Sequence, residues 1–187
     1  MLRSSFTFLV YIVFFIIQKH VIYPIEVFFF QPEIIDKASV LYLPHAIRII
    51  SFFLIGFSSV IPIFLAQCFT FIFLNDIDFM YSIILSFISV SSVVFGFYCF
   101  QSVKKLDLFL IEKNDWKKLI LIGFFASIFN AFFSSIYFSN FNFNQFDVML
   151  SLRFIIGDTF GVLVGMIVLI FILKIYQIGK KNEFFKN

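Results

Sequence analysis

The feature that most constrains this chain is a succession of apolar stretches, each about as long as a membrane-spanning helix. A helix needs about 20 apolar residues to cross a bilayer. Six stretches reach or approach that length, and they cover residues 5–23, 38–55, 58–74, 79–102, 118–138 and 147–175. A single run over 38–74 is too long for one span, so the sequence GFSS at 56–59 predicts a tight hairpin between the second and third helices.

The overall composition also indicates a membrane protein. Of the 187 residues, 61% are hydrophobic and only 13% are charged, whereas soluble domains average about half apolar and a quarter charged. A water-soluble core of this size cannot hide so much apolar surface. The sequence therefore predicts an all-α, polytopic membrane helical bundle with six transmembrane helices, which form one integral membrane domain over residues 1–187. The first apolar run lacks a small-residue cleavage site and is interpreted as a retained helix.

The distribution of lysine and arginine orients the predicted helices, because cytoplasmic connections are enriched in these residues. The connection 103–118 and the C-terminal tail are rich in lysine, whereas the connections 75–78 and 139–147 contain aspartate and no basic residue. Both termini are therefore predicted to be cytoplasmic. Residues 24–37 are predicted to lie along the outer membrane surface, or to form a partly buried connection there.

Several functional classes are disfavoured by the sequence. The net charge is +3 without a long basic run, which argues against nucleic acid binding. Cys68 and Cys99 lie in apolar runs and are interpreted as small buried hydrophobic residues rather than disulfide partners or metal ligands. The sequence contains no Ser/His/Asp set, no paired carboxylates within a span and no His/Cys metal spacing. We therefore expect no enzyme activity, no catalytic residue, no metal and no cofactor.

Charged or ionisable residues inside a bilayer are costly and usually face the bundle interior. Four such residues lie well inside predicted spans: His45, Arg48, Arg153 and Asp158. Arg48 lies about ten residues and Asp158 about eleven residues into helices that both start at the outer surface, so they reach a similar depth. This predicts an Arg48–Asp158 ion pair. His45 shares a helix face with Arg48, whereas Arg153 lies about 140° around its helix from Asp158 and close enough to the surface to snorkel.

The role of these polar residues has three interpretations. In the first, Arg48 and Asp158 only neutralise each other and fix the helix register. In the second, His45, Arg48 and Asp158, with or without Arg153, line a polar cavity open to the outer side. The excess positive charge of that cavity would suit a small anionic or zwitterionic molecule. In the third, His45 and Asp158 couple the protein to protons. In the fifth predicted helix, Asn130 and Ser134 share a face and are expected to make interhelical hydrogen bonds.

Pro44 precedes the charged pair and has two interpretations. It marks a helix that begins near Leu43 after an extended entry at 38–42, or it kinks a longer helix. In either case irregular backbone or a helix end lies beside His45 and Arg48. Such backbone is tolerated at membrane depth where it is buried in protein or lines a cavity.

The sixth predicted helix contains glycines at every fourth position, Gly157, Gly161 and Gly165. This spacing makes a smooth ridge that lets another helix approach closely. The ridge is interpreted as a packing surface, with its partner either inside the chain or in another protein, including a second copy of the chain.

Two stretches resemble the bacterial membrane-associated sensor domains of the first class. Residues 43–74 are similar to the hairpin of that family, and residues 153–173 are similar to its last signature. The matching positions are Pro44, Gly56, Pro62 and Ala66 in the hairpin, and Asp158 and Gly161 in the last helix. The resemblance covers about 50 of 187 residues.

The resemblance implies a membrane input module for signalling. Members of that family have about eight helices and an attached cytoplasmic output domain, whereas this chain has six predicted helices and ends at Asn187. The resemblance therefore implies a reduced sensory module without an output domain, which signals through a separate partner.

Three functions are consistent with the sequence. The first is a non-enzymatic sensory or ligand-binding module in the bacterial plasma (inner) membrane, surrounded by lipid. The second is the substrate-binding subunit of an energy-coupling-factor importer, because six helices in a chain of this length resemble those subunits as well. The third is a structural subunit of a larger membrane complex that docks through the glycine ridge.

Overall fold

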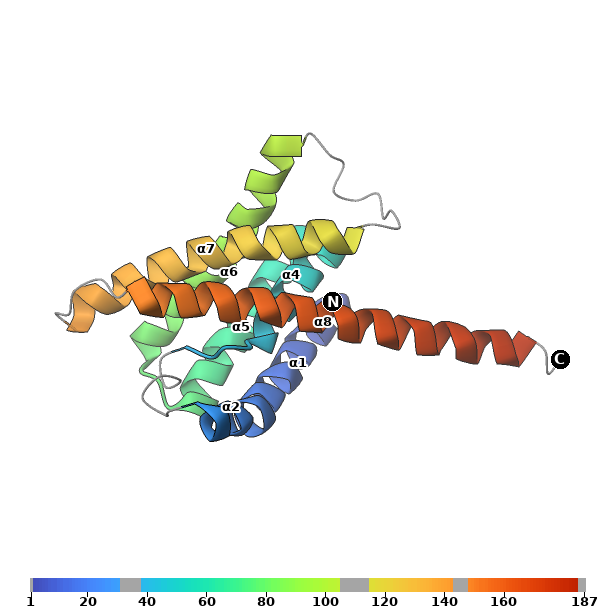
Figure 1. Cartoon of the computed structure of the whole chain (residues 1–187), viewed down its shortest axis with the longest axis horizontal. Helices are drawn as coiled ribbons and strands as arrows, with labels where there is room; N and C mark the ends of the chain where they lie inside the picture. Colours follow the sequence, from blue (N-terminus) through green and yellow to red (C-terminus); the bar gives the residue numbers. More distant parts are fainter. Residues whose placement is uncertain (1, 31–37, 105–114, 143–147, 185–187) are drawn as a thin grey trace.

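The computed structural model describes residues 2–30, 38–104, 115–142 and 148–184, and within these ranges the secondary structure consists of helices and turns (Figure 1). Two π-helical turns and one 3-10 turn interrupt the α-helices. The elements are α1 (Leu2–Ile17), η1 (Gln18–Ile22), α2 (Tyr23–Phe29), α4 (Leu43–Ile55), η2 (Gly56–Ser59), α5 (Val60–Phe69), η3 (Thr70–Leu74), α6 (Phe79–Lys104), α7 (Asp115–Asn142) and α8 (Val148–Phe184).

Five helical stretches in the described residues are long and apolar enough to cross a membrane, one fewer than the six predicted. They are Ser4–Phe29, Leu43–Leu74, Phe79–Gln101, Trp116–Phe138 and Val148–Ile172. The difference arises because the second and third predicted spans form one continuous helical stretch of 32 residues. The chain is thus an all-α integral membrane protein.

The stretch Leu43–Leu74 folds back on itself. The backbone N–H of Leu43 donates to Gln18 Oε1 over 3.0 Å, and the carbonyl oxygen of Leu74 accepts a hydrogen bond from the neighbouring Lys19. A straight helix of 32 residues would separate its ends by about 48 Å, so both ends can meet η1 only if the chain reverses. The reversal lies at Gly56, whose φ of 60° is in the left-handed region that favours glycine.

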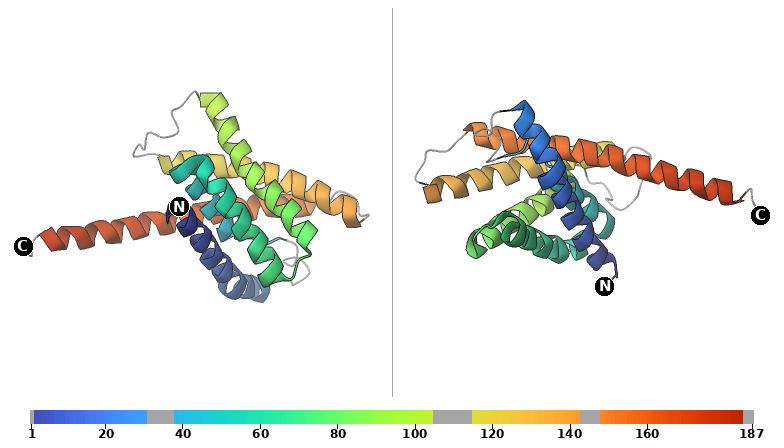
Figure 2. Two further views of the ribbon diagram at one scale, coloured as in Figure 1. Left: turned by 180° about the vertical axis from the view of Figure 1, so that it is seen from behind. Right: turned by 90° about the horizontal axis from the view of Figure 1, so that it is seen from below.

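The remaining long helices pack side by side in sequence order (Figures 1 and 2). Helix α7 runs antiparallel to α8, since Gly123 faces Val162 near one end of the pair and Phe138 faces Phe154 near the other. Helix α8 continues well past the bundle in both figures. At about 1.5 Å per residue, its 37 residues reach about 55 Å, which exceeds the thickness of a bilayer.

Helix α4 is the centre of the bundle. It contributes to both hydrophobic cores, of which one joins it to α6, α7 and α8 and the other joins it to α1, α5 and α6. Most of its residues are buried, including His45 and Arg48. Large exposed side chains elsewhere are mostly Phe, Leu and Ile, which is the pattern expected where a bundle faces lipid.

The extended entry before α4 packs directly on the glycine ridge of α8. Tyr42 has φ −105° and ψ 89°, so helix α4 begins at Leu43, as one interpretation of Pro44 predicts. The backbone N–H of Tyr42 donates to the carbonyl oxygen of Gly157 over 2.9 Å. A Cβ at Gly157 or Gly161 would overlap the carbonyl oxygens of Ser39 and Tyr42. The ridge is therefore filled from inside the chain.

The first helix runs further than the end of the predicted span 5–23. The backbone N–H of Tyr23 donates to the carbonyl oxygen of Gln18, five residues earlier, which is the π-helical pattern. Pro24 then falls in the first turn of α2, where its missing N–H is tolerated. The helix continues to Phe29, and the predicted surface segment 24–37 is thus helical over its first part.

Some sequence predictions fall on residues outside the described ranges. These are residues 31–37 of the predicted surface segment, most of the lysine-rich connection 103–118, the end of the connection 139–147 and the last residues of the tail.

Candidate functional site

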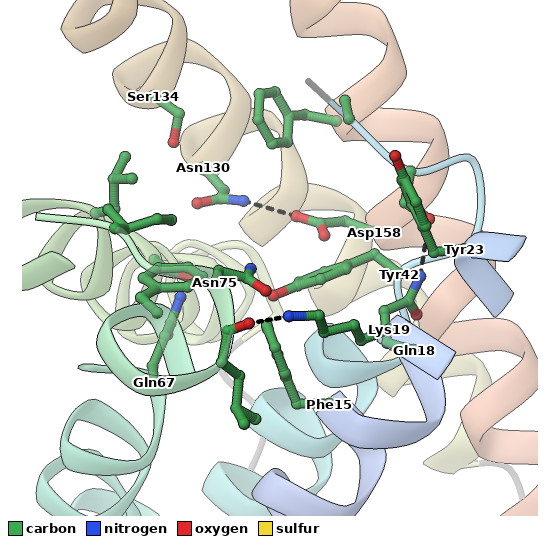
Figure 3. A pocket seen from close by; sticks show the side chains of 18 of the residues that line it. Phe15, Gln18, Lys19, Tyr23, Tyr42, Gln67, Asn75, Asn130, Ser134 and Asp158 are labelled. Carbon is green, nitrogen blue, oxygen red and sulfur yellow. Dashed lines mark hydrogen bonds between the residues drawn. The ribbon is translucent and has the colours of Figure 1, made fainter. Parts of the chain in front are cut away.

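A cavity of about 1270 Å³ lies between the helices at the end of the bundle where α1 and η3 finish and α8 begins (Figure 3). Its polar and charged lining residues come from eight parts of the chain, which are η1, the entry segment, α4, α5, the turn after η3, α6, α7 and α8. These residues are Gln18, Lys19 and His20; Ser39 and Arg48; Gln67; Asn75 and Asp76; Ser89; and Asn130, Ser134, Ser135 and Asp158. Aromatic and aliphatic side chains complete the wall, among them Phe15, Phe71, Tyr81, Leu85, Phe138 and Phe154.

The cavity extends from an exposed rim to a buried floor. Asn75 and Asp76, at the rim, are exposed. Arg48 and Asp158 also line the cavity, and each is only 1% exposed. The predicted charged pair therefore lies at the closed end of a cavity that opens toward one end of the bundle.

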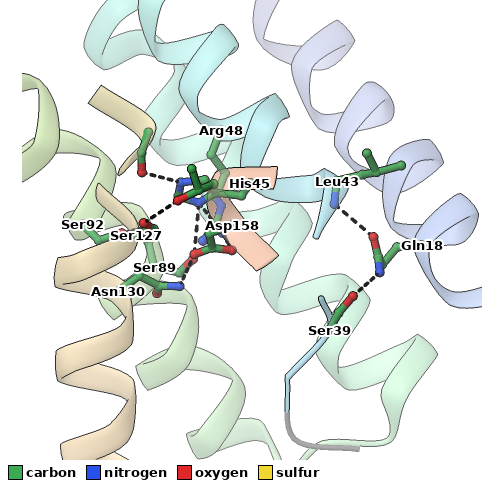
Figure 4. Close-up of polar contacts among 12 residues, drawn as sticks. Gln18, Ser39, Leu43, His45, Arg48, Ser89, Ser92, Ser127, Asn130 and Asp158 are labelled. Atoms are coloured by element: carbon green, nitrogen blue, oxygen red, sulfur yellow. Dashed lines mark hydrogen bonds and ion pairs between the residues drawn. The ribbon is translucent and has the colours of Figure 1, made fainter. Parts of the chain in front are cut away.

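The floor of the cavity brings the predicted ion pair together (Figure 4). Arg48 Nη2 lies 3.6 Å from Asp158 Oδ1, which is an ionic contact but too long for a hydrogen bond. The other carboxylate oxygen, Asp158 Oδ2, accepts a hydrogen bond of 2.8 Å from Asn130 Nδ2. The interhelical hydrogen bond expected of Asn130 is thus present, and its acceptor is the buried carboxylate.

His45 lies behind the pair and orients the guanidinium group. Its Nε2 is 3.3 Å from the carbonyl oxygen of Gly123, and a carbonyl oxygen only accepts hydrogen bonds. Nε2 therefore carries the proton, and Nδ1 accepts a hydrogen bond of 2.7 Å from Arg48 Nη2. With this tautomer, the 3.4 Å contact between His45 Nδ1 and Asp158 Oδ2 joins two acceptors and is not a hydrogen bond. His45 is not among the residues that line the cavity.

Arg48 is bonded only in part. Among the described residues, its Nε and Nη1 atoms are buried and have no hydrogen-bond partner. Its guanidinium carbon lies 5.6 Å from the centre of the Tyr42 ring, a cation–π distance. Gln67 Oε1 and Ser89 Oγ, which belong to residues that line the same cavity, are also buried without a partner in the described part of the chain. Three helices, α4, α5 and α6, thus each place unpaired hydrogen-bonding atoms beside the cavity. Burying such atoms without a partner is costly.

A second polar network fastens the entry segment to the first helix (Figure 4). Buried Glu26 accepts hydrogen bonds from the Ser39 hydroxyl and from the Leu41 backbone N–H, the latter over 2.7 Å. Gln18 Nε2 donates to Ser39 Oγ over 2.9 Å, while Gln18 Oε1 accepts from Leu43. Glu26 falls in the segment 24–37 that was predicted to lie at the membrane surface, so this network was not predicted from the sequence. The polar Gln18 inside an apolar run was the signal for it.

The charged residues of the described lining balance one another. Lys19 donates to the carbonyl oxygen of Leu74 and thereby joins the two π-helical turns η1 and η3 across the cavity (Figure 3). The lining holds the basic residues Lys19 and Arg48 and the acidic residues Asp76 and Asp158. The predicted excess of positive charge is therefore absent from the described lining.

Arg153 does not join the other predicted site residues. It is partly exposed on α8 and does not line the cavity. The described residues contain no group of three or more His, Cys, Asp or Glu side chains that would hold a metal ion. Of the four predicted site residues, the structure thus brings together Arg48 and Asp158, with His45 behind them.

No protein-family model, curated protein or solved structure matches this chain. The resemblance to membrane-associated sensor domains therefore stays a prediction from the sequence.

Proposed function

We propose that this protein is a non-enzymatic membrane module that binds a small anionic or zwitterionic molecule, with Arg48 as the anchor. The observation that carries the proposal is that Arg48 lines a large cavity while two of its buried donor atoms have no partner in the described residues. A permanently charged guanidinium with unused N–H donors is the side chain best suited to carboxylate or phosphate oxygens. An anionic ligand group would satisfy these donors and offset the cost of burying them.

We further propose six membrane crossings with both termini in the cytoplasm of a bacterial cell, which places the cavity on the outer side. Helix α4 has 13 residues and reaches about 20 Å, less than the ~30 Å hydrocarbon core. These six crossings require the folded-back stretch Leu43–Leu74 to cross twice in a thinned bilayer; if it instead entered and left from the outer face, the chain would cross four times. Both arrangements leave the termini on one side, whereas one straight span would separate them.

A sensory role is our preferred use of this binding site. The entry segment 38–42 forms part of the cavity wall and is bonded to both α8 and the first helix. Occupancy of the cavity would therefore act on contacts that hold several helices together. The structural-subunit hypothesis relied on the glycine ridge as a docking surface, and that ridge is covered by Ser39–Ala46 of the same chain. A structural subunit would need a different surface.

Thermal unfolding of the purified chain tests the proposed binding. The panel contains inorganic phosphate, acetate, succinate, citrate and free amino acids, each added to protein in mild detergent. We expect at least one member to raise the melting temperature of the wild type. If none does, the binding function is wrong.

Two variants separate binding by Arg48 from general effects. The double variant Arg48→Gln/Asp158→Asn removes both charges together, so it leaves no unpaired ion, and we expect it to fold but lose the stabilisation. Arg153→Gln removes an arginine that does not line the cavity, so this variant should still be stabilised by the ligand. Equal stabilisation of the double variant would show that the ligand binds elsewhere.

Uptake assays address the importer alternative. Cells that express the chain with an energy-coupling module would accumulate a labelled ligand if it is an importer subunit. Accumulation would contradict a purely sensory role, whereas binding without accumulation supports it.

A further inference from the structure

We propose that the preferred ligand of the cavity is a zwitterion with an apolar or aromatic body, held with its anionic group on Arg48 and its cationic group on Asp158. This inference rests on the binding function proposed above and narrows it to one chemical class.

The ion pair at the floor of the cavity is incompletely bonded. Arg48 Nη2 and Asp158 Oδ1 are 3.6 Å apart, which leaves a cation and an anion side by side without a direct hydrogen bond. A buried ion pair repays its desolvation only when its geometry is good and its remaining donors and acceptors are bonded. A zwitterion supplies an anion to the unused Arg48 donors and a cation to the carboxylate, so it completes both halves at once.

The positive and negative charges of the described lining residues are equal in number. The charged lining residues Lys19 and Arg48 are matched by Asp76 and Asp158. A simple anion in this cavity would leave one uncompensated negative charge in a poorly solvated space, and a simple cation would leave a positive one. A zwitterion adds no net charge. The lining therefore favours a ligand of zero net charge that still carries separated ionic groups.

The same cavity is also lined by a residue with an unused hydrogen-bond acceptor. Gln67 Oε1 is buried, and it has no hydrogen-bond partner within the described ranges. Figure 3 shows Gln67, Asn130 and Asp158 around the same space. An ammonium group has three N–H donors, so it can bond to Asp158 and still donate to the Gln67 amide.

The cavity is large, and part of its wall is apolar. Its volume of about 1270 Å³ is above the 300–1,000 Å³ that is usual for small-molecule pockets. Phe15, Phe71, Phe138 and Phe154 are among the residues that line it. Apolar walls of this kind stabilise an apolar or aromatic body, which a compact polar zwitterion such as glycine lacks.

Four matched probes test the charge requirement on the full chain in lipid nanodiscs by isothermal titration calorimetry. L-phenylalanine and its dipeptide L-phenylalanyl-L-phenylalanine carry both charges. The analogue 3-phenylpropanoate lacks the ammonium group, and 2-phenylethylamine lacks the carboxylate. We expect at least one zwitterion to bind about tenfold or more tightly than either singly charged analogue, because each analogue leaves one buried ion without its hydrogen bond.

Substitutions in the protein test the same assignment. Gln67→Met keeps the length of the side chain but removes the acceptor, so it should weaken binding of the zwitterion about tenfold and leave 3-phenylpropanoate unchanged. Asp158→Asn should shift the preference toward 3-phenylpropanoate. The control Ser127→Ala removes a buried hydroxyl whose partners are Phe124 and Thr159, away from the cavity lining, and it should alter neither affinity.

The outcomes distinguish this inference from the broader function. If the wild type binds 3-phenylpropanoate as tightly as the two zwitterions, or more tightly, the assignment of a zwitterionic ligand is wrong. The proposed anion-binding function would still stand. Equal binding of the zwitterion to Gln67→Met would remove the assigned role of Gln67. If none of the four probes binds to folded protein, the inference is wrong, and stabilisation by another member of the anion panel would still support the function.

Discussion

The two arms of the folded-back stretch Leu43–Leu74 are both apolar, but they differ in how fully they are buried. In α4, every residue from Leu43 to Ile50 is buried, including His45 and Arg48. In α5, Ile61 and Leu65 are more than half exposed, although this arm carries no charge. Lipid is as apolar as leucine, so burial in a membrane protein follows polarity and packing rather than hydropathy. The arm with the charges is therefore the one at the centre.

The strongest test of this contrast displaces α4 from its place. In Gly161→Leu, the new side chain meets the backbone carbonyl oxygen of Tyr42 at the start of that arm. Backbone cannot move aside as a flexible side chain does, so we expect loss of the folded protein. Size-exclusion chromatography after mild solubilisation measures this as loss of the monodisperse peak.

The neighbouring position gives a matched control for this substitution. Phe160 is 52% exposed on the same helix, and Phe160→Leu introduces the same residue there. This variant should remain monodisperse. A monodisperse Gly161→Leu protein would mean that α4 and α8 do not pack as described.

The next largest effect comes from the charged pair. Arg48→Met or Asp158→Asn alone leaves one buried charge without its partner, and each should lower the free energy of unfolding by about 3–5 kcal/mol. The double variant Arg48→Met/Asp158→Asn should recover most of this loss of stability, because it leaves no unpaired charge. Denaturation in mixed micelles, followed by far-ultraviolet circular dichroism, measures the differences.

The opposite arm supplies the comparison for that pair. Gln67 on α5 is buried like Arg48, but its Oε1 atom has no partner in the described residues. Gln67→Met should therefore change the unfolding free energy by less than about 1 kcal/mol. A loss as large as that of Arg48→Met would show that α5 has hydrogen bonds that its geometry does not reveal.

These contrasts show what the sequence does and does not determine. The depth of Arg48 and Asp158 followed from helix rise and loop charges, and their pairing was predicted on that basis. The role of Asn130 followed from its polarity inside an apolar helix. The Glu26 network was missed because it depends on the π-helical turn at Gln18–Ile22, which carries the helix past Pro24. The glycine spacing predicted close packing without identifying Ser39–Ala46 as its partner.

A smaller effect is expected where the two arms are fastened to the first helix. Glu26→Ala removes the carboxylate that accepts from the Ser39 hydroxyl and the Leu41 N–H just before α4. It should cost about 1–3 kcal/mol, since these partly buried donors lose a charged acceptor and keep only the contacts that they make with each other. Lys19→Met removes a single hydrogen bond to Leu74 at the end of the other arm and should cost only about 0.5–1.5 kcal/mol. Chemical denaturation of both variants measures the difference, and equal losses would contradict a tighter attachment of α4.

The smallest structural perturbation decides how the two arms cross the membrane. Ser58 is exposed in the turn between them, so Ser58→Cys in a background without Cys68 and Cys99 should leave stability unchanged within about 0.5 kcal/mol. If the arms cross twice, a membrane-impermeant maleimide will label the Ser58→Cys protein only from the cytoplasmic side. The matched Asn75→Cys protein, changed at another exposed position, will then be labelled only from outside. If the arms form a re-entrant hairpin, the Ser58→Cys protein will stay unlabelled in sealed vesicles of either orientation. Labelling of both proteins from the same side would contradict both arrangements, because the two positions lie at opposite ends of α5.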